Sequence, residues 1–419
     1  MPDTDGIRAF ELVFALSEAV DLVSPQVSNH HHRTAAIASM LAEEAGLPPD
    51  KHDNLLMAAA VHDAGALTLR EKLDIMNFEK APEQHAELGA RLLAEFAPFS
   101  KTADIVRWHH SRYRDAARYG GVIPFESRLL TLADRIAVLL GEKRGILNRA
   151  PEITEKIRAA SGSMFDPKAV DVFMSAQAKE MFWLDAVHAG AQHPPHPRNL
   201  QAAVQLDSDS ILEIGKLFSH AIDFRSPFTA THSTGVAACA QQLAKYARFK
   251  PEELRLMRLA GYLHDLGKLA VPNTILIKPG PLTREEFGIM RTHPYYTFRT
   301  LEHIPALHTV NLWASCHHEK VNGKGYPFHL KGKQMSTGAL LMAAADIFTA
   351  ITEDRPYRNA MEKTTAMSII KQLAANGSLD KNAATLVTAN FDELSQVREK
   401  EQTQARKRYD YTVKCEGDD

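Results

Sequence analysis

The stretch MRLAGYLHDLGKL at residues 257–269 has a near copy, LLMAAAVHDAGAL, at residues 55–67. Apolar residues recur at helical spacing in both, and in the second copy Leu259, Leu263 and Leu266 fall on one face. Each copy contains a His-Asp pair followed by an alanine or a leucine and then by a glycine. The stretch predicts one α-helix that carries a histidine and an aspartate, and the chain contains it twice.

The match continues on both sides of this helix. The offset between the copies only increases along the chain, and its increments fall where loops are expected. The matched ligand-type residues are His30 with His232, His62 with His264, Asp63 with Asp265, His85 with His293, His109 with His317, His110 with His318, and Asp134 with Asp346. Since a chance match would not keep this order, the sequence predicts an internal duplication of roughly 190 residues per copy, a common domain size.

The duplication gives a domain plan for the whole chain. We expect domains at residues 1–187 and 205–395, a proline-rich linker at 188–204, and a polar helical or disordered tail at 396–419. β-branched alternation is nearly absent, and Thr283 followed by Glu286 predicts a capping box at the start of a helix. We therefore expect an all-α protein of two tandem helical domains.

Bulk composition excludes several classes of protein. The 419 residues are 45% hydrophobic and 24% charged, with a net charge of -2. This balance gives no general attraction to nucleic-acid polymers or to anionic membranes, so any binding of phosphate must be local. Three scattered cysteines are too few for a disulfide framework or a thiolate zinc site. With no long apolar run and no export signal, we expect a cytoplasmic protein that does not span a membrane.

The 20 histidines are the unusual feature, and they cluster with aspartates. A lone buried aspartate can be satisfied by an arginine or a helix cap, but seven ligand-type residues at repeated positions favour metal. Imidazole and carboxylate together suit iron, manganese, nickel, cobalt or zinc, and the missing thiolates argue against a closed structural zinc site. The candidate ligands in the second copy are His232, His264, Asp265, His293, His317, His318 and Asp346.

Seven ligand groups are more than one ion needs. Two divalent ions bridged by a carboxylate, with Asp265 as the bridging candidate, would hold a bridging hydroxide and suit phosphoester hydrolysis. Lys268 lies four residues after His264, so we expect it on the same helix face, where it could contact a phosphate oxygen. The alternative for Lys268 is an ordinary surface lysine.

A glycine-rich turn follows the paired histidines in HHEKVNGKGYP, residues 317–327. Gly323 and Gly325 can adopt backbone angles closed to other residues, and Pro327 restricts the exit direction. Such a turn can hold Tyr326 in one orientation. We expect the histidines to hold metal and the rigid turn to form a wall of the substrate pocket.

Three blocks, HDLGK (264–268), HHEKVNGKGYP and ADIFTAITEDRPYR (345–358), resemble the HD-GYP family of the HD phosphohydrolase superfamily. The resemblance covers about residues 205–390, and the first copy resembles a divergent HD domain. It implies an all-α domain with a two- or three-metal site, most often iron or manganese. It also implies a phosphodiesterase that hydrolyses cyclic dinucleotides, mostly cyclic di-GMP to pGpG and in some members on to GMP.

Carried over, the resemblance makes the seven residues of the second copy metal ligands, with Asp265 and Lys268 catalytic. The implied substrate contacts are Lys268, Gly325, Tyr326, Pro327, Arg355 and Arg358. Members with a third metal have a glutamate where this chain has Phe228, so two ions are expected. Thr349 stands where the family often has an aspartate, which leaves 3'3'-cyclic GMP-AMP open as an alternative substrate.

The first copy keeps a possible second metal site, but it has Ala66 where the second has Lys268. It also has YRDAARYGGVIPF, residues 113–125, where the second has its GYP loop. We expect a regulatory or structural metal domain there, and the alternative is a relic whose histidines merely pack. The residues of this site are His30, His62, Asp63, His85, His109, His110 and Asp134.

Two other functions compete with a cyclic-dinucleotide phosphodiesterase. One is a non-catalytic sensor or scaffold for a signalling partner, which would need neither Lys268 nor a complete ligand set. The other is an HD hydrolase of nucleotides or phosphomonoesters, against which the GYP loop speaks. Since no receiver or cyclase domain is recognisable, an input signal would come through the first copy or a partner protein.

Overall fold

The computed structural model describes residues 9–21, 29–63, 65, 82–94, 96, 99–120, 123–141, 145–189, 208–223, 231–354 and 360–414. Within these ranges the regular structure is helical, and the only β-type pairing is two isolated bridges, Ser161 with Phe165 and Asn322 with Lys331. The all-α prediction is confirmed. None of the helices described is both long enough and apolar enough to cross a membrane.

The described residues between 8 and 205 form one compact unit, and those between 206 and 419 form another. We call them the N-terminal and C-terminal domains. Most of the predicted linker, from residue 190 onward, lies outside the described residues.

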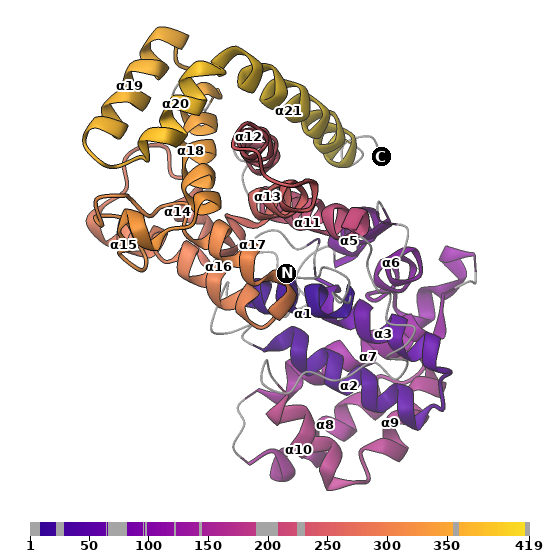
Figure 1. The fold of residues 1–419 in the computed structure, drawn as a ribbon. Helices are drawn as coiled ribbons and strands as arrows, with labels where there is room; N and C mark the ends of the chain where they lie inside the picture. Colours follow the sequence, from indigo (N-terminus) through magenta and orange to yellow (C-terminus); the bar gives the residue numbers. More distant parts are fainter. Residues whose placement is uncertain are drawn as a thin grey trace. The chain divides into compact units, whose positions relative to one another are not determined.

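The N-terminal domain is drawn in indigo to magenta in Figure 1. Its elements are α1 (Ala9–Asp21), α2 (His30–Glu44), α3 (Pro49–Val61), α5 (Pro82–Ala94), α6 (Ser100–Arg107), the 3₁₀ segment η2 (Tyr113–Tyr119), α7 (Phe125–Leu140), α8 (Ile146–Ala159), α9 (Pro167–Ala176) and α10 (Glu180–His188).

The C-terminal domain follows in red to yellow. Its elements are α11 (Ser208–Asp223), α12 (His232–Tyr246), α13 (Pro251–Leu263), η3 (Leu266–Ala270), α14 (Asn273–Leu276), α15 (Arg284–Met290), α16 (His293–Glu302), η4 (Pro305–Leu307), α17 (His308–Ser315), η5 (Gly332–Gln334), α18 (Thr337–Thr352), α19 (Lys363–Ala375), α20 (Lys381–Ala389) and α21 (Phe391–Lys414).

The same helix packing occurs in both domains. In the N-terminal domain α2 packs on α3 and α7, α6 packs on α3, α5 and α7, and α3 packs on α7. The C-terminal helices α12, α13, α16, α17 and α18 make the same six contacts in the places of α2, α3, α5, α6 and α7. The predicted duplication is therefore confirmed in three dimensions.

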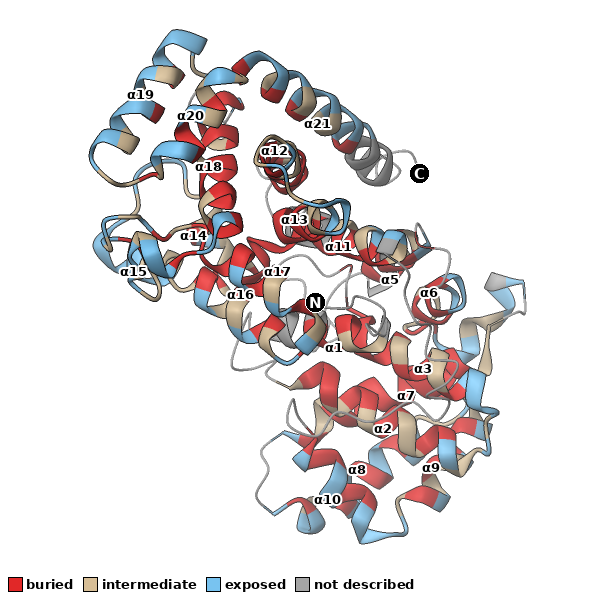
Figure 2. Cartoon of the chain, in the orientation of Figure 1, coloured by how far each residue is buried: buried red, intermediate tan, exposed pale blue. Residues whose placement is uncertain are grey.

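The central helices of each domain are buried along most of their length. Figure 2 shows this for α12 and α18, whose apolar side chains include Leu243, Met342 and Phe348. Asp346 lies within α18 among these residues and is itself 9% exposed. Since an unpaired carboxylate in such a setting is very costly, its partners identify a site.

The predicted helix through residues 257–269 ends earlier than expected. α13 stops at Leu263, and Lys268 lies in the 3₁₀ segment η3 instead of on the helix face of His264. The backbone N–H of Gly267 donates to Thr297 Oγ1 at 2.9 Å, outside the helical pattern. A Cβ atom on Gly267 would lie 1.9 Å from the carbonyl oxygen of His293. This close approach of α16 forces the chain out of the helix.

Two local predictions concern helix ends. The capping box of α15 is present, since Glu286 N donates to Thr283 Oγ1 and Thr283 N donates to the Glu286 carboxylate. The polar stretch from Val397 continues α21, which packs on α12. Arg398 and Ala405 are buried, so this stretch contributes to the domain, and the predicted boundary at residue 395 falls inside the helix.

Candidate metal centres

The C-terminal domain brings all seven predicted ligands together. They come from five helices and the segments that follow them. Each histidine lies at the first residue of a helix or shortly after the last residue of one. His232 and His293 begin α12 and α16, His264 and Asp265 follow α13, His317 and His318 follow α17, and Asp346 lies in α18.

Six of the seven side chains form two groups of three. In the first group, His232, His264 and Asp346 place one ligand atom each within 4.8 Å of one another. His293, His317 and His318 form the second group by the same measure. The shortest contacts are 3.3 Å from His232 Nε2 to Asp346 Oδ1, and 3.2 Å between the Nε2 atoms of His293 and His317.

Asp265 lies between the two groups. Its Oδ2 atom is 3.2 Å from His264 Nε2, and its Oδ1 atom is 3.4 Å from His293 Nε2 and 3.9 Å from His317 Nε2. One oxygen therefore faces each group. This is the arrangement that a bridging carboxylate requires.

Backbone carbonyls set the tautomers of three ligands. The Nδ1–H groups of His264, His293 and His317 donate to the carbonyl oxygens of Gly261, Met290 and Ala314, three residues earlier in each case, at 2.6–2.8 Å. A carbonyl can only accept, so Nδ1 carries the hydrogen and the Nε2 lone pair faces the group.

His232 is oriented by a carboxylate instead. Its Nδ1 lies 2.8 Å from Glu353 Oε1, and Gln402 of α21 donates to the other oxygen of Glu353 at 3.0 Å. Sequence reasoning did not assign a role to Glu353, although it lies in the block ADIFTAITEDRPYR. Its partner is 121 residues away, so only the fold reveals the pair.

Neighbouring charges and burial determine the protonation states of the candidate ligands. Burial opposes ionisation of Asp265, but His264 and Lys268 hold its pKa well below the usual range. Burial lowers the pKa of His293, His317 and His318 to about 3, so these rings are neutral at neutral pH. For His232 burial acts in the same direction, but Glu353 and Asp346 outweigh it and raise the pKa to about 10.

These residues fit a pair of divalent transition-metal ions. Imidazoles and ionised carboxylates are the donors such ions bind, and the positive charge that the two carboxylates favour at His232 is one that a metal ion can supply in place of the proton. His264 Nε2 is fully buried and has no hydrogen bond of acceptable geometry, although Asp265 Oδ2 lies nearby. A buried nitrogen lone pair without a donor needs a ligand such as a metal ion.

Lys268 reaches the same centre from η3. Its ammonium group donates to Asp265 Oδ2, and its side chain is 20% exposed. His318, with a side chain 31% exposed, is the most accessible of the seven candidate ligands. Lys268 and His318 therefore mark the open side of the centre, and Lys268 is not an ordinary surface lysine.

The glycine-rich turn is held by Glu319. This glutamate is 2% exposed, and its carboxylate accepts the backbone N–H groups of Phe328, His329 and Leu330 at 2.7–3.1 Å. A Cβ atom on Gly325 would lie 2.4 Å from the Cα atom of Glu319. The turn is thus folded tightly back on the segment that carries His317 and His318.

Tyr326 lies beside the open side of the centre. Its ring centroid is 4.9 Å from that of His318, and the guanidinium of Arg291 lies 4.8 Å above its ring. Burial raises the pKa of Tyr326, so its hydroxyl remains a hydrogen-bond donor. Arg291 was not predicted, because nothing near it in sequence connects it to the GYP loop.

The sequence singled out four further residues of this domain. Arg355, Arg358 and Phe228 lie outside the described residues. Thr349 is fully buried in α18, so this position belongs to the core.

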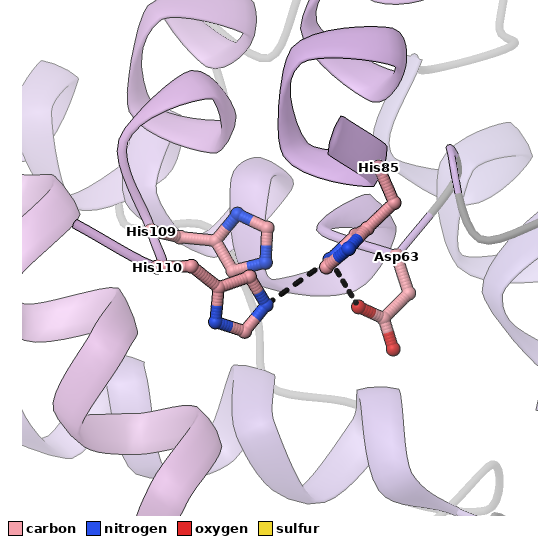
Figure 3. Close-up of side chains that lie close together, drawn as sticks. All are labelled: Asp63, His85, His109 and His110. Carbon is pink, nitrogen blue, oxygen red and sulfur yellow. Dashed lines mark hydrogen bonds and ion pairs between the residues drawn. The ribbon is translucent and has the colours of Figure 1, made fainter. Parts of the chain in front are cut away.

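The N-terminal domain also brings its seven predicted residues together. His30 Nε2 lies 3.2 Å from Asp134 Oδ1 and 3.3 Å from His62 Nε2. A second group comprises Asp63, His85, His109 and His110, in which the imidazoles of His109 and His110 point toward His85 and Asp63 (Figure 3). Ala66 lies outside the described residues.

Tautomers and charges are set here as in the other domain. The Nδ1–H groups of His62 and His109 donate to Ala59 O and Val106 O at 2.9 and 2.6 Å. Burial lowers the pKa of His85 to about 4 and that of His109 to about 3. The residues also fit a metal ion, since His109 Nε2 is fully buried and has no hydrogen-bond partner among the described residues.

Comparison with known proteins agrees with this arrangement. Two family models described as HD domain match residues 27–139 and 216–383. A 3'3'-cGAMP-specific phosphodiesterase of Vibrio cholerae is 28% identical over 94% of both chains. A cyclic di-GMP phosphodiesterase of Pseudomonas aeruginosa is 34% identical over 54% of this chain and 53% of that protein.

A solved structure shares the fold. The crystal structure of a cyclic GMP-AMP specific phosphodiesterase of Vibrio cholerae aligns over 92% of this chain and 98% of the other, with a TM-score of 0.63 and 23% identity. Together with the two HD models and the HDLGK and GYP blocks, these matches place the chain in a family. It is a member of the HD-GYP family that carries two HD domains in tandem.

Proposed function

We propose that this protein is a metal-dependent phosphodiesterase that hydrolyses cyclic dinucleotides in its C-terminal domain. The observation that carries the proposal is the convergence of seven ligand residues, Lys268 and the GYP loop on one centre. A sensor or scaffold needs no such combination. Two divalent ions at these residues, for which we favour iron or manganese, would supply Lewis-acid activation of water and neutralise phosphate charge when bound.

The residues of the chain divide the remaining work. Lys268, on the open side of the centre, would contact a non-bridging oxygen of the scissile phosphate and offset the charge that develops there. Its present partner is Asp265 Oδ2, so substrate phosphate and Asp265 share this ammonium group. Because His293, His317 and His318 are already neutral, each can bind a metal ion without first losing a proton.

The GYP loop supplies the wall of the substrate pocket. Glu319 fixes the loop backbone, and the phenol of Tyr326 offers a ring face for a base and a hydroxyl for a polar contact. Arg291, stacked over Tyr326, is a cation at the same edge of the site. We include Gly325 and Pro327 with Tyr326 as substrate-binding residues, and Arg355 and Arg358 as further phosphate or base contacts.

Two cyclic dinucleotides are candidate substrates. The HD-GYP blocks favour cyclic di-GMP, cleaved to pGpG and, in some members of the family, on to GMP. A relative that matches both domains is named as specific for 3'3'-cGAMP, which favours that dinucleotide as the second candidate.

The test is hydrolysis of each dinucleotide by the full chain, loaded anaerobically with Fe(II) or Mn(II) and followed by chromatography. His264→Ala/Asp265→Ala should abolish cleavage, whereas the matched pair His62→Ala/Asp63→Ala should retain it. Failure of the metal-loaded protein to cleave either dinucleotide would refute the enzyme and leave a sensor or scaffold. Cleavage of mononucleotides or phosphomonoesters alone would favour a general HD hydrolase.

A further inference from the structure

The two domains differ in how the aspartate of the His-Asp pair is used. In the C-terminal domain Asp265 directs one oxygen to each ligand group. In the N-terminal domain a single oxygen of Asp63, Oδ1, lies 3.5 Å from His62 Nε2 and 3.6 Å from His85 Nε2. The other oxygen, Oδ2, faces His31 at 4.0 Å. Asp63 Oδ1 therefore faces both groups at once, while Oδ2 faces His31, which forms with His62 and Asp63 a third close set that overlaps both groups.

His31 has no equivalent in the other domain. It follows His30 in the chain, and the residue that follows His232 is Ser233. The imidazole of His31 is 1% exposed and packs 5.0 Å from the ring of His62, centroid to centroid. This additional side chain lies beside the His30–His62–Asp134 group and faces the Asp63 oxygen that a bridging role would use.

A buried arginine engages the second aspartate of the N-terminal domain. Arg135 donates from Nε and Nη2 to Asp134 Oδ2, at 2.9 and 2.7 Å, and both side chains are at least 95% buried. The residue after the matching Asp346 is Ile347, which has no charge. The guanidinium thus places a fixed positive charge directly beside Asp134, whereas the residue that follows Asp346 is uncharged.

This charge affects the two groups of the N-terminal domain differently. A divalent ion among His30, His62 and Asp134 would share the Asp134 carboxylate with the guanidinium and be repelled by it. The group of Asp63, His85, His109 and His110 does not include Asp134, whose carboxylate Arg135 binds. The carboxylate of this group belongs to Asp63, which is not part of that ion pair.

The second group also has an unsatisfied ligand atom. His109 is fully buried, and its Nε2 lone pair has no hydrogen-bond partner among the described residues. His85 Nε2 lies 3.0 Å from His110 Nε2 and 3.6 Å from Asp63 Oδ1, as the dashed lines of Figure 3 mark. Three imidazoles and one carboxylate in this proximity are a donor set for a transition-metal ion.

We propose that the N-terminal domain binds one divalent transition-metal ion, at Asp63, His85, His109 and His110, and that Arg135 replaces the second ion. The domain is then a one-metal centre in which a protein cation neutralises Asp134. This proposal does not depend on which phosphodiester the C-terminal domain cleaves.

The test counts metal ions in the full chain. The variant His264→Ala/Asp265→Ala removes ligands of both C-terminal groups, and elemental analysis after metal loading and desalting should then give one ion per chain. Adding His110→Ala, at a half-buried position, should abolish this binding, while adding His30→Ala should retain it. Arg135→Ile, which installs the residue of the C-terminal domain, should raise the count to two.

Controls separate metal loss from misfolding. His52→Ala removes a buried histidine that bonds to Ser39 and Asp53 away from both groups, and it should leave the count at one. Helicity and the unfolding temperature are measured for every variant, and His109→Ala serves as a second ligand variant. Zero or two ions in the His264→Ala/Asp265→Ala protein would overturn the proposal. So would retention of the ion in His110→Ala together with its loss in His30→Ala.

Discussion

Glu353 orients the first histidine of the C-terminal centre without being a ligand candidate itself. Its carboxylate accepts from His232 Nδ1 and from Gln402. Glu353→Gln keeps the shape but removes the charge, so we expect the metal affinity to fall about 10–100-fold, as for other carboxylates behind a metal-bound histidine. Competition with a chromogenic chelator measures this directly.

The matched control is Glu401→Gln, which removes a carboxylate from the same region that pairs with Arg258. Unchanged metal affinity in Glu353→Gln, or an equal loss in the control, would contradict the positioning role. A drop in kcat that is restored by excess metal would support it.

The thiol of Cys239 gives a pH prediction. Burial raises its pKa to about 12, and the sulfur lies 3.8 Å from the carbonyl oxygen of Leu394. In the unfolded chain this thiol ionises at a pH of about 8.5. The buried neutral thiol therefore contributes its full stability below that pH and progressively less as the pH rises toward 12. Native protein should therefore resist alkylation at Cys239 at pH 9, as read by peptide mass spectrometry.

Labelling of native Cys239 at the rate of a free thiol would show that the site opens. Cys239→Ala provides the comparison for stability, because its free energy of unfolding should lose less than that of the wild type between pH 8.5 and 10.

The candidate ligands were predictable because they repeat, whereas the residues that support them were not. Glu319, Glu353 and Arg135 occur once and have no counterpart of the same kind in the other domain. Counted from the matching aspartates, Glu353 corresponds to Gly141. A single buried charged residue leaves no repeating pattern in the sequence. Its partner can be identified only from the fold, in which helices distant in sequence come together.

Among the elements, the GYP loop depends on one carboxylate. Glu319 accepts three consecutive N–H groups, so Glu319→Ala would remove the carboxylate partner of all three at once. Hydrogen bonds to a charged group contribute roughly 1.5–3 kcal/mol each. We expect faster amide exchange at Phe328, His329 and Leu330 and a raised KM, with the metal content retained.

Amide exchange followed by mass spectrometry tests this loop directly. Lys320→Ala, a change at the exposed neighbouring position, is the control and should leave exchange unchanged. Unaltered exchange in Glu319→Ala would mean that other contacts hold the loop.

A pair of equivalent glycines separates the two domains experimentally. A Cβ atom on Gly267 would lie 1.9 Å from His293 O, and one on Gly65 would lie 2.1 Å from His85 O. Each alanine substitution should push apart two segments that carry ligands, at a cost of about 1–3 kcal/mol or more. We expect Gly267→Ala to lose activity and Gly65→Ala to keep it, in parallel hydrolysis assays.

Equal loss of activity in both variants would show that the N-terminal domain is needed for catalysis. The same glycines explain the one incorrect prediction about an element. Helical spacing extends through Leu266, but the approach of α16 at Gly267 ends α13 at Leu263. The spacing of apolar residues predicts the buried face of the helix, but it does not reveal the contact with α16 that ends the helix.

For the whole molecule, the duplication was the feature that the sequence revealed most fully. Ordered repeats predicted two all-α domains, and six helix contacts recur in both. The polar α21 was harder to predict, because its buried face is made by a few residues such as Arg398 and Ala405 within a charged stretch. Its packing on α12 follows from the tertiary fold.

Metal removal should be visible in the unfolding of the chain. Binding to the native state alone adds RT ln(1 + [L]/Kd) to stability, about 2.7 kcal/mol when the ion is present at 100 Kd. Calorimetry should therefore show a transition that moves down on chelation, and His264→Ala/Asp265→Ala should remove the larger part of that shift. A chelator-insensitive melting curve would contradict metal binding in both domains.

Each ligand set is complete within its own domain. In evolutionary terms, the two halves are free to drift separately, because a substitution in one leaves the other's donor atoms in place. Ala66 and Arg135 are differences of this kind, since the matching positions of the other copy hold Lys268 and Ile347. One half can therefore keep its full set of donor atoms while the other half changes.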